Sequence, residues 1–189
     1  MSRKAQHRDA IISSAATLFR QQGYAATGIN EIVAQSGAPK GSLYHYFPGG
    51  KEQLGEEAVR HAGKHAAKTL MELAAKHETA VSLLTAYGEI LAGWMTKSDF
   101  QEGCPITTVL LEMAPNSDAL ARAGRDAFDS WRAVFKEALL QDNVEPPRAD
   151  RLAALAISAL EGAMVQARVE RSGEPITNAA EEIAVLFAI

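Results

Sequence analysis

A short run near the N-terminus gathers side chains that could bind phosphate or the edges of bases. Lys40, Ser42, Tyr44 and His45 stand within six residues of one another, and Lys51 follows shortly after. Ammonium groups offer point charges to phosphates, whereas hydroxyl and imidazole groups form hydrogen bonds with a nucleic-acid backbone or with base edges. These residue types predict contact with a polyanion rather than bond-making chemistry.

Two further residues belong to the same interpretation. Gly41 has no side chain, so a helix that contains it could approach a duplex closely, and a glycine inside a helix otherwise costs about 1 kcal/mol relative to alanine. Thr27 stands before the apolar residues Ile29 and Ile32, where we expect it to cap a short helix and to offer a hydroxyl group to a phosphate.

The elements that must position these groups are two short helices separated by a turn. Ser36-Gly37 ends the first helix, and Pro39 stands where a proline is tolerated, at the first turn of the second, which we expect to run from Lys40 to Phe47. Leu43 and Phe47 are four residues apart, so they share a face that should pack on Ile32, and the opposite face presents the polar groups. This is a helix-turn-helix pattern, whose second helix enters the major groove. The alternative is an aromatic-rich core helix beside a solvated lysine.

The rest of the chain also reads as helical. Ala, Leu, Glu, Arg and Lys dominate, apolar residues recur every three or four positions, and no stretch alternates like a half-buried strand. We expect an all-α fold, with an N-terminal three-helix domain at residues 1–50 and a helical bundle at residues 51–189. The expected helices cover residues 5–22, 27–36, 40–47, 51–77, 79–97, 105–114, 117–141, 147–171 and 177–189.

Charge is distributed unevenly along the chain. The formal net charge is −4, which by itself argues against nucleic acid. However, residues 1–51 hold six lysines and arginines against two acidic residues, which gives this segment a formal charge of +4. The remainder holds 13 basic and 21 acidic residues, which gives −8. A basic N-terminal segment followed by an acidic remainder is typical of a protein whose N-terminal module binds phosphates.

Composition excludes several classes of protein. Apolar residues make up 47% of the chain and charged residues 22%, and no uninterrupted apolar run approaches the ~20 residues that span a bilayer. The N-terminus lacks the pattern of a signal peptide, so we expect a cytoplasmic protein without a membrane segment. The one cysteine, Cys104, cannot form a disulfide within the chain, and we interpret it as a buried apolar residue.

The segment from Ile12 to Leu54 closely resembles the DNA-binding domain of TetR-family regulators. The resemblance rests on Leu18-Phe19, Gly23-Tyr24 and Thr27, on Ile32-Val33 and Ser36-Gly37, and on the run from Lys40 to Phe47. It implies three DNA-reading helices followed by a bundle that binds a small inducer and dimerises. Carried over by position, Thr27, Tyr44 and Lys51 would contact phosphates, and Lys40, Gly41, Ser42 and His45 would face the major groove.

Two departures from the commonest family pattern point to a branch. An extra residue lies between Phe47 and Lys51, and Pro39 replaces the usual hydroxyl residue before Lys40, which puts a hydroxyl contact at that position in doubt. Together with Phe100, Gly103-Cys104-Pro105 and Leu160-Glu161-Gly162-Ala163, these features resemble the LmrA/YxaF-like branch, whose members often resemble regulators of drug-efflux genes.

Aromatic and methionine residues gather in the middle of the chain and could line an effector pocket. Phe128, Trp131 and Phe135 share one helical stripe. Such walls favour an apolar or aromatic effector, with polarity from Glu112, Glu161 or Gln166, although for any one residue a plain core position is the alternative. The candidate lining residues are Tyr87, Trp94, Phe100, Leu110, Met113, Phe128, Trp131, Phe135 and Met164.

The last two expected helices carry apolar faces that must be covered. One stripe runs through Ala153, Ala156, Ile157, Leu160, Ala163, Met164 and Ala167, and the segment from Ala184 to Ile189 ends the chain. Two helices from each subunit would form a four-helix homodimer interface, as the resemblance implies. Alternatively, both helices close over their own subunit.

We therefore expect a ligand-responsive repressor that leaves a palindromic operator when its effector binds. A ligand-independent DNA-binding protein of the same fold is one alternative, and activation remains open. A small helical enzyme is another. His61 and His65 have a spacing that could hold a metal, but no HExxH, G-x-S-x-G or phosphate-loop motif is present. We expect no cofactor and no metal.

Overall fold

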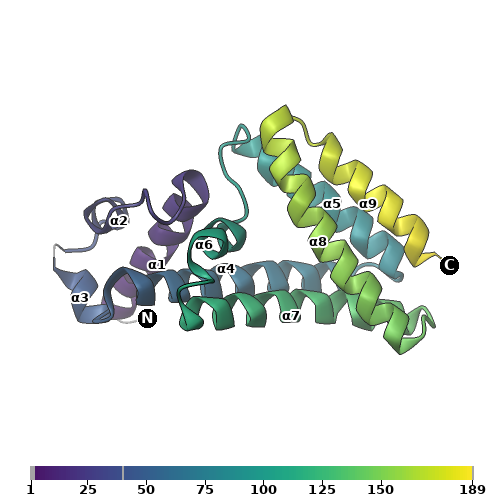
Figure 1. Cartoon of the computed structure of the whole chain (residues 1–189), viewed down its shortest axis with the longest axis horizontal. Helices are drawn as coiled ribbons and strands as arrows, with labels where there is room; N and C mark the ends of the chain where they lie inside the picture. The colour runs from purple at the N-terminus through teal and green to yellow at the C-terminus, as the bar shows by residue number, and fades with distance from the viewer. Residues whose placement is uncertain (1–2, 40, 189) are drawn as a thin grey trace. The chain divides into compact units, whose positions relative to one another are not determined.

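The computed structural model describes residues 3–39 and 41–188, and the described residues form helices and connecting turns without a strand (Figure 1). The all-α prediction is confirmed. The helices are α1 (Arg3–Gln22), α2 (Ile29–Ser36), α3 (Ser42–Tyr46), α4 (Gly50–Ala74), α5 (Ala80–Lys97), α6 (Pro105–Met113), α7 (Asp118–Gln141), α8 (Pro146–Glu170) and α9 (Glu174–Phe187).

The chain packs into two compact units. The first contains residues 1–64 and 104–127, and the second contains residues 65–103 and 128–189. Two of the three boundaries fall inside the long helices α4 and α7, and the third lies between α5 and α6. The division at residues 50 and 51 that we expect from the sequence stays a prediction about domains.

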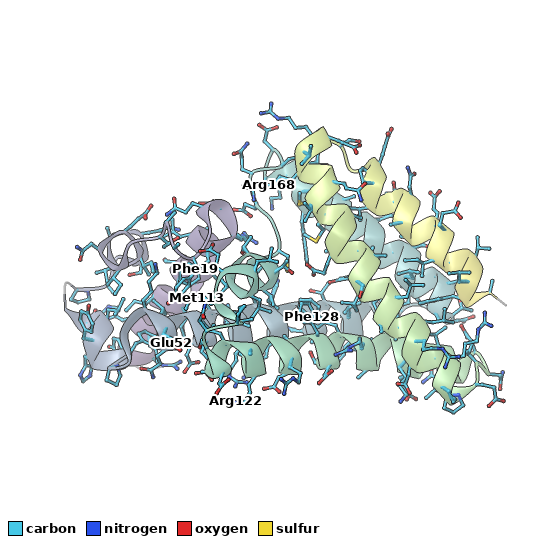
Figure 2. All side chains as sticks on the ribbon, in the orientation of Figure 1. Phe19, Glu52, Met113, Arg122, Phe128 and Arg168 are labelled. Atoms are coloured by element: carbon cyan, nitrogen blue, oxygen red, sulfur yellow. The ribbon has the colours of Figure 1, made fainter. Side chains whose placement is uncertain are left out.

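In the first unit, α1 packs against α2, α3 and α6. The core of this unit contains Ile11, Phe19, Ile32, Leu43 and Phe47, each with at most 1% of its surface exposed. Phe19 is labelled in Figure 2. The residues that face this core recur at three- and four-residue spacing within their helices, which is why the short helices α2 and α3 can dock on α1.

The start of α2 differs from the prediction. Gly28, not Thr27, is the N-cap residue, and the carboxylate of Glu31 accepts a hydrogen bond from the Gly28 backbone N–H at 3.4 Å. The Thr27 hydroxyl instead donates to the Gly23 carbonyl at 2.7 Å. Local bonding back to the end of α1 therefore replaced the expected cap. The predicted stop is confirmed, because Gly37 caps α2 with a φ of 66°.

The helix α3 is shorter than predicted. It begins at Ser42, so Pro39 lies before the helix rather than in its first turn. Gly41 is the N-cap residue and has a φ of 88°, in the left-handed region that favours glycine. The reason for a glycine here is this backbone conformation, and our prediction of a glycine within the helix was wrong.

Other helix ends differ from the predicted ends by up to three residues. The helix expected to reach residue 77 ends at Ala74, after which Lys76 and His77 form turn hydrogen bonds to Leu73. The last helix begins at Glu174 rather than residue 177, with Pro175 in its first turn, where the missing N–H has no partner to lose.

In the second unit, α5, α8 and α9 lie side by side (Figure 1). Close approach is possible because small residues meet: a Cβ atom added at Gly88 of α5 would lie 2.7 Å from the Cβ atom of Ala180 in α9. The predicted apolar stripe on α8, from Ala153 to Ala167, is buried within this chain. Those residues are therefore covered by their own subunit, which was the alternative for them.

One described helix, α8, is long and apolar enough by composition to cross a membrane. The core helices of soluble proteins pass the same test, and α8 packs on α5 and α9.

Candidate nucleic-acid interface

The helix α3 presents two faces of different character. Leu43 and Phe47 point into the core and are 1% and 0% exposed, whereas Tyr44 is 60% exposed and His45 is also exposed. The His45 and Tyr46 rings meet edge to face, with centroids 5.1 Å apart. An aromatic hydroxyl group and an imidazole thus stand at the surface on a helix whose other face is anchored.

Ser42, the first residue of α3, bonds back to Pro39. The Ser42 hydroxyl donates to the Pro39 carbonyl at 2.6 Å, so this hydroxyl already has a partner within its own chain. A Cβ atom at Gly41 would meet nothing within 4 Å, which leaves this point of the backbone open. Lys40, the remaining predicted groove-facing residue, lies outside the described residues.

Thr27 is buried rather than displayed. It is 1% exposed, and its hydroxyl group also accepts a hydrogen bond from the Gln22 amide at 3.3 Å while donating to the Gly23 carbonyl. The side chain therefore stabilises the turn between α1 and α2. Its contact with phosphate stays a prediction.

Lys51 lies in the first turn of α4 and is held against the α1–α2 turn. Its Nζ atom lies 4.4 Å from the centre of the Tyr24 ring and donates to the Ala25 carbonyl at 3.4 Å. Partial burial lowers the pKa of the Lys51 amine below its usual value, and the Glu112 carboxylate opposes this effect. Burial, Glu52 and Glu112 together raise the pKa of the Tyr24 hydroxyl.

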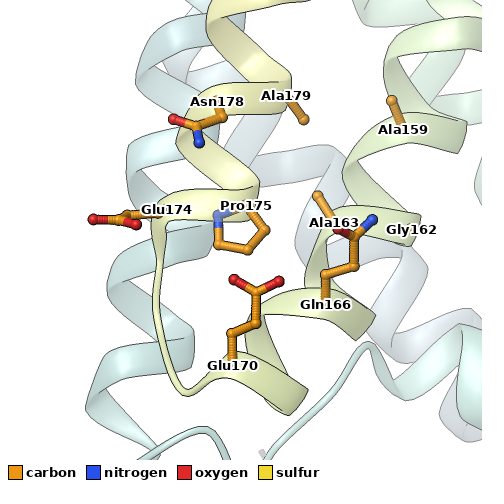
Figure 3. Close-up of a pocket in the computed structure, with 9 residues that line it drawn as sticks. All are labelled: Ala159, Gly162, Ala163, Gln166, Glu170, Glu174, Pro175, Asn178 and Ala179. Carbon is orange, nitrogen blue, oxygen red and sulfur yellow. The ribbon is translucent and has the colours of Figure 1, made fainter.

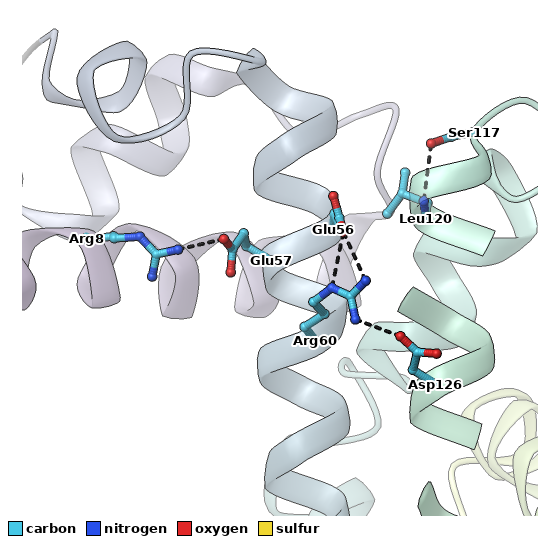
Figure 4. Close-up of polar contacts among 7 residues, drawn as sticks. All are labelled: Arg8, Glu56, Glu57, Arg60, Ser117, Leu120 and Asp126. Carbon is cyan, nitrogen blue, oxygen red and sulfur yellow. Dashed lines mark hydrogen bonds and ion pairs between the residues drawn. The ribbon is translucent and has the colours of Figure 1, made fainter. Parts of the chain in front are cut away.

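Ion pairs connect helices within the first unit (Figure 4). Arg8 of α1 pairs with Glu57 of α4 at 2.6 Å, and Arg60 of α4 pairs with Asp126 of α7 at 2.8 Å. Arg60 also bonds Glu56 one helical turn earlier, at 3.1 Å. The partners are 49 and 66 residues apart, so no local spacing in the sequence could have revealed these two pairs.

The candidate effector-binding residues fall in both units. Leu110 and Met113 lie on α6 in the first unit, and the other candidates lie in the second. Of these, Tyr87, Trp131, Phe135 and Met164 are buried. The Tyr87 and Phe135 rings are 6.0 Å apart, edge to face. Such contacts occur in any apolar core, so a lining role stays a prediction.

Trp94, Phe128 and Phe100 are less covered than these four residues. Trp94 is 40% exposed and stacks on His65, with ring centres 6.3 Å apart. Phe128 meets the Trp131 ring edge to face at 5.4 Å, and Phe100 adopts a φ of 57° in the loop after α5. Positive φ in a bulky residue is uncommon and marks a specific loop conformation.

An open groove of about 490 Å³ lies between α8 and α9 (Figure 3). None of the predicted aromatic or apolar lining residues borders it, but Gln166, one of the three candidates for polarity at the effector site, does. Its walls are mostly small or polar: Ala159, Gly162, Ala163, Gln166, Glu170, Glu174, Pro175, Asn178 and Ala179.

The described part of the chain contains no group of three His, Cys, Asp or Glu side chains that could hold a metal ion. His65 of the candidate metal-binding pair stacks on Trp94 instead.

Comparison with known proteins assigns the chain to a family. Residues 11–58 match the bacterial regulatory proteins of the tetR family, and residues 80–182 match the C-terminal domain of LmrA/YxaF-like transcriptional regulators. The chain belongs to the TetR family. The predicted LmrA/YxaF-like branch is also confirmed, and the relatives are transcriptional regulators rather than enzymes.

Individual relatives cover nearly the whole chain. An uncharacterized HTH-type transcriptional regulator of Mycobacterium tuberculosis is 40% identical, covering 89% of this chain and 88% of its own. YxaF, an HTH-type transcriptional regulator of Bacillus subtilis, is 34% identical, covering 98% and 97%. The crystal structure of a TetR transcriptional regulator from Chloroflexus aurantiacus is 28% identical, covers 98% and 96%, and superposes with a TM-score of 0.77. This TetR-family member is therefore a DNA-binding transcriptional regulator.

Proposed function

We propose that this regulator is a homodimeric repressor that binds a palindromic operator and is released from it by a small apolar or aromatic effector. The observation that carries the DNA-binding part is the division of α3, where Leu43 and Phe47 anchor one face and Tyr44 and His45 stand exposed on the other. A helix held this way can enter a major groove without losing its core contacts.

We place Tyr44, His45, Ser42, Gly41 and Lys40 at the groove. Lys51 approaches the phosphates from the start of α4, and the buried Thr27 acts beside it by holding the α1–α2 turn. In this arrangement the Tyr24 ring and the Ala25 carbonyl direct the Lys51 ammonium group, so part of its side-chain entropy is lost before binding. Operator DNA as the partner also makes the cytoplasm the expected location.

Dimerisation through α8 and α9 is supported by their exposed faces. Leu155, Val165 and Val169 on α8, with Val185 and Leu186 on α9, are exposed large apolar side chains. The small residues that line the groove between these helices would let a second copy approach closely. This face differs from the buried stripe that the sequence suggested. The α3 helices of the two subunits, placed about one helical turn of DNA apart, would then match two half-sites.

Repression is supported by names among the more distant relatives. DhaR of a Mycobacterium species, 24% identical, and ComR of Escherichia coli, 27% identical, are both named transcriptional repressors. Effector release is supported by the aromatic content of the second unit, where Tyr87 and Phe135 form one edge-to-face pair and Phe128 and Trp131 form another. The branch resemblance extends the proposal to control of drug-efflux genes.

Selection of bound sequences from random duplex DNA tests the DNA-binding proposal. The full-length protein at about physiological salt should enrich an inverted repeat, because a symmetric dimer reads two copies of one half-site. Enrichment of a single unrepeated site would contradict the dimeric arrangement. If a folded dimer enriches no motif, the protein does not bind DNA sequence-specifically.

Thermal unfolding with a panel of apolar cations and flavonoid-like aromatics tests effector binding. A ligand that binds only the native state raises its stability by about 2.7 kcal/mol at a concentration of 100 times Kd. A compound that both raises the melting temperature and weakens operator binding supports release by an effector. If no compound shifts the melting temperature, the ligand-independent alternative is favoured.

A further inference from the structure

The end of α6 holds the turn between α1 and α2 through a single carboxylate. Glu112 Oε1 accepts a hydrogen bond from the Tyr24 backbone N–H at 2.8 Å, and Glu112 Oε2 accepts one from the Ala25 backbone N–H at 2.6 Å. Hydrogen bonds from backbone N–H groups to a carboxylate are stronger than those between neutral groups. One side chain thus fixes two consecutive peptide units that are 87 and 88 residues away in the sequence.

The turn held by Glu112 also supports the DNA-facing groups. The Tyr24 ring and the Ala25 carbonyl both contact the Lys51 ammonium group. The Tyr24 carbonyl accepts from the Thr27 backbone N–H at 3.2 Å. Movement of residues 24 and 25 would therefore displace the supports of both Lys51 and Thr27.

Gly23 shows that the carboxylate lies directly against the turn. A Cβ atom at this position would lie 2.6 Å from Glu112 Oε1, closer than real Cβ atoms approach. Gly23 has a φ of 87° and donates its N–H to the Phe19 carbonyl at 2.9 Å. The glycine thus ends α1 and also leaves space for the carboxylate.

We infer that Glu112 is a positioning residue for DNA binding, which holds the α1–α2 turn and through it sets the place of Lys51. This inference rests on the proposed contact between Lys51 and phosphate. Electrostatics alone predicts the opposite behaviour. A negative charge near Lys51 repels DNA, so its removal should strengthen binding if the carboxylate has no positioning role.

Two substitutions separate position from charge. Glu112→Gln removes the charge and leaves an amide whose NH₂ group cannot accept from a backbone N–H. Glu112→Asp keeps the charge but is one methylene shorter, so it cannot reach both N–H groups from the same backbone position. Asp126→Asn is the matched control, since it makes the same charge change in the same unit but breaks only the pair with Arg60. Glu112 is exposed, so its variants should fold.

The experiment measures operator affinity, thermal unfolding and amide hydrogen exchange on the full-length protein, with the DNA selected for the wild type. We expect both Glu112 variants to weaken binding by about tenfold or more, as for the loss of one hydrogen bond to a charged group. The Tyr24 and Ala25 amides should exchange faster in both variants. Asp126→Asn should bind as well as wild type or slightly better.

Three results would overturn the inference. These are unchanged or tighter binding by Glu112→Gln, unchanged exchange at residues 24 and 25, or a lower melting temperature with wild-type affinity of the folded protein. The last result would show a purely structural role. Failure of the wild type to select DNA, or unchanged affinity in a Lys51 variant, would instead count against the proposed function.

Discussion

At the scale of single residues, the first prediction concerns Lys51, whose ammonium group contacts the Tyr24 ring and the Ala25 carbonyl. Removing its charge while keeping its length should weaken DNA binding, so Lys51→Met should reduce operator affinity. The slope of log K against log salt should shrink by about 0.9 per subunit, the value for one lost phosphate contact. Affinity measured by fluorescence anisotropy at several salt concentrations checks this. Lys97→Met, on an exposed lysine of α5, is the control. Equal salt slopes for Lys51→Met and Lys97→Met would show that Lys51 does not contact a phosphate.

Tyr44 belongs to the same scale because its side chain is mostly in solvent. Tyr44→Ala should weaken operator binding while leaving the free energy of unfolding within about 0.5 kcal/mol of wild type, as for surface substitutions. Phe47→Ala removes an aromatic ring three residues later that is fully buried, so it should instead cost about 3–5 kcal/mol of stability. Urea unfolding and DNA titration together measure both effects. A large stability loss in Tyr44→Ala would show that this ring is part of the core.

At the scale of elements, the contact between α5 and α9 depends on a missing side chain. Gly88→Ala should destabilise the fold by about 1–3 kcal/mol, because the new methyl group would overlap the Ala180 side chain and push the helices apart. Gly93→Ala on the same helix meets nothing within 4 Å and should be neutral or stabilise by up to about 1 kcal/mol through helix propensity. Urea unfolding compares the pair. Equal stabilities would show that the helices tolerate a wider separation.

At the scale of the whole molecule, the prediction concerns assembly. Val165→Glu on α8 should shift the protein toward monomer, because a charge would be buried where two copies meet. Met71→Glu on α4 is a matched control, since Met71 is 55% exposed and Val165 is 57% exposed. Sedimentation or light scattering over a concentration series measures the shift. Dimers of equal strength in both variants would place the interface elsewhere.

The local sequence determined the helices and the character of the DNA-facing head. Three- and four-residue spacing of apolar side chains, with glycine and proline at the breaks, set most helix bounds to within three residues. The run from Lys40 to Phe47 carried the resemblance to the family. These features could be predicted because periodicity and turn chemistry act over a few residues.

Only the tertiary structure decided which groups meet across long separations. The α8 stripe is buried by its own subunit, and Arg8 of α1 pairs with Glu57 of α4, 49 residues later. The Glu112 carboxylate reaches a turn 87 residues earlier. The physical reason is that a helical period shows which face of a segment is apolar but not which partner covers it. Folding selects that partner by packing and hydrogen bonding of the whole chain.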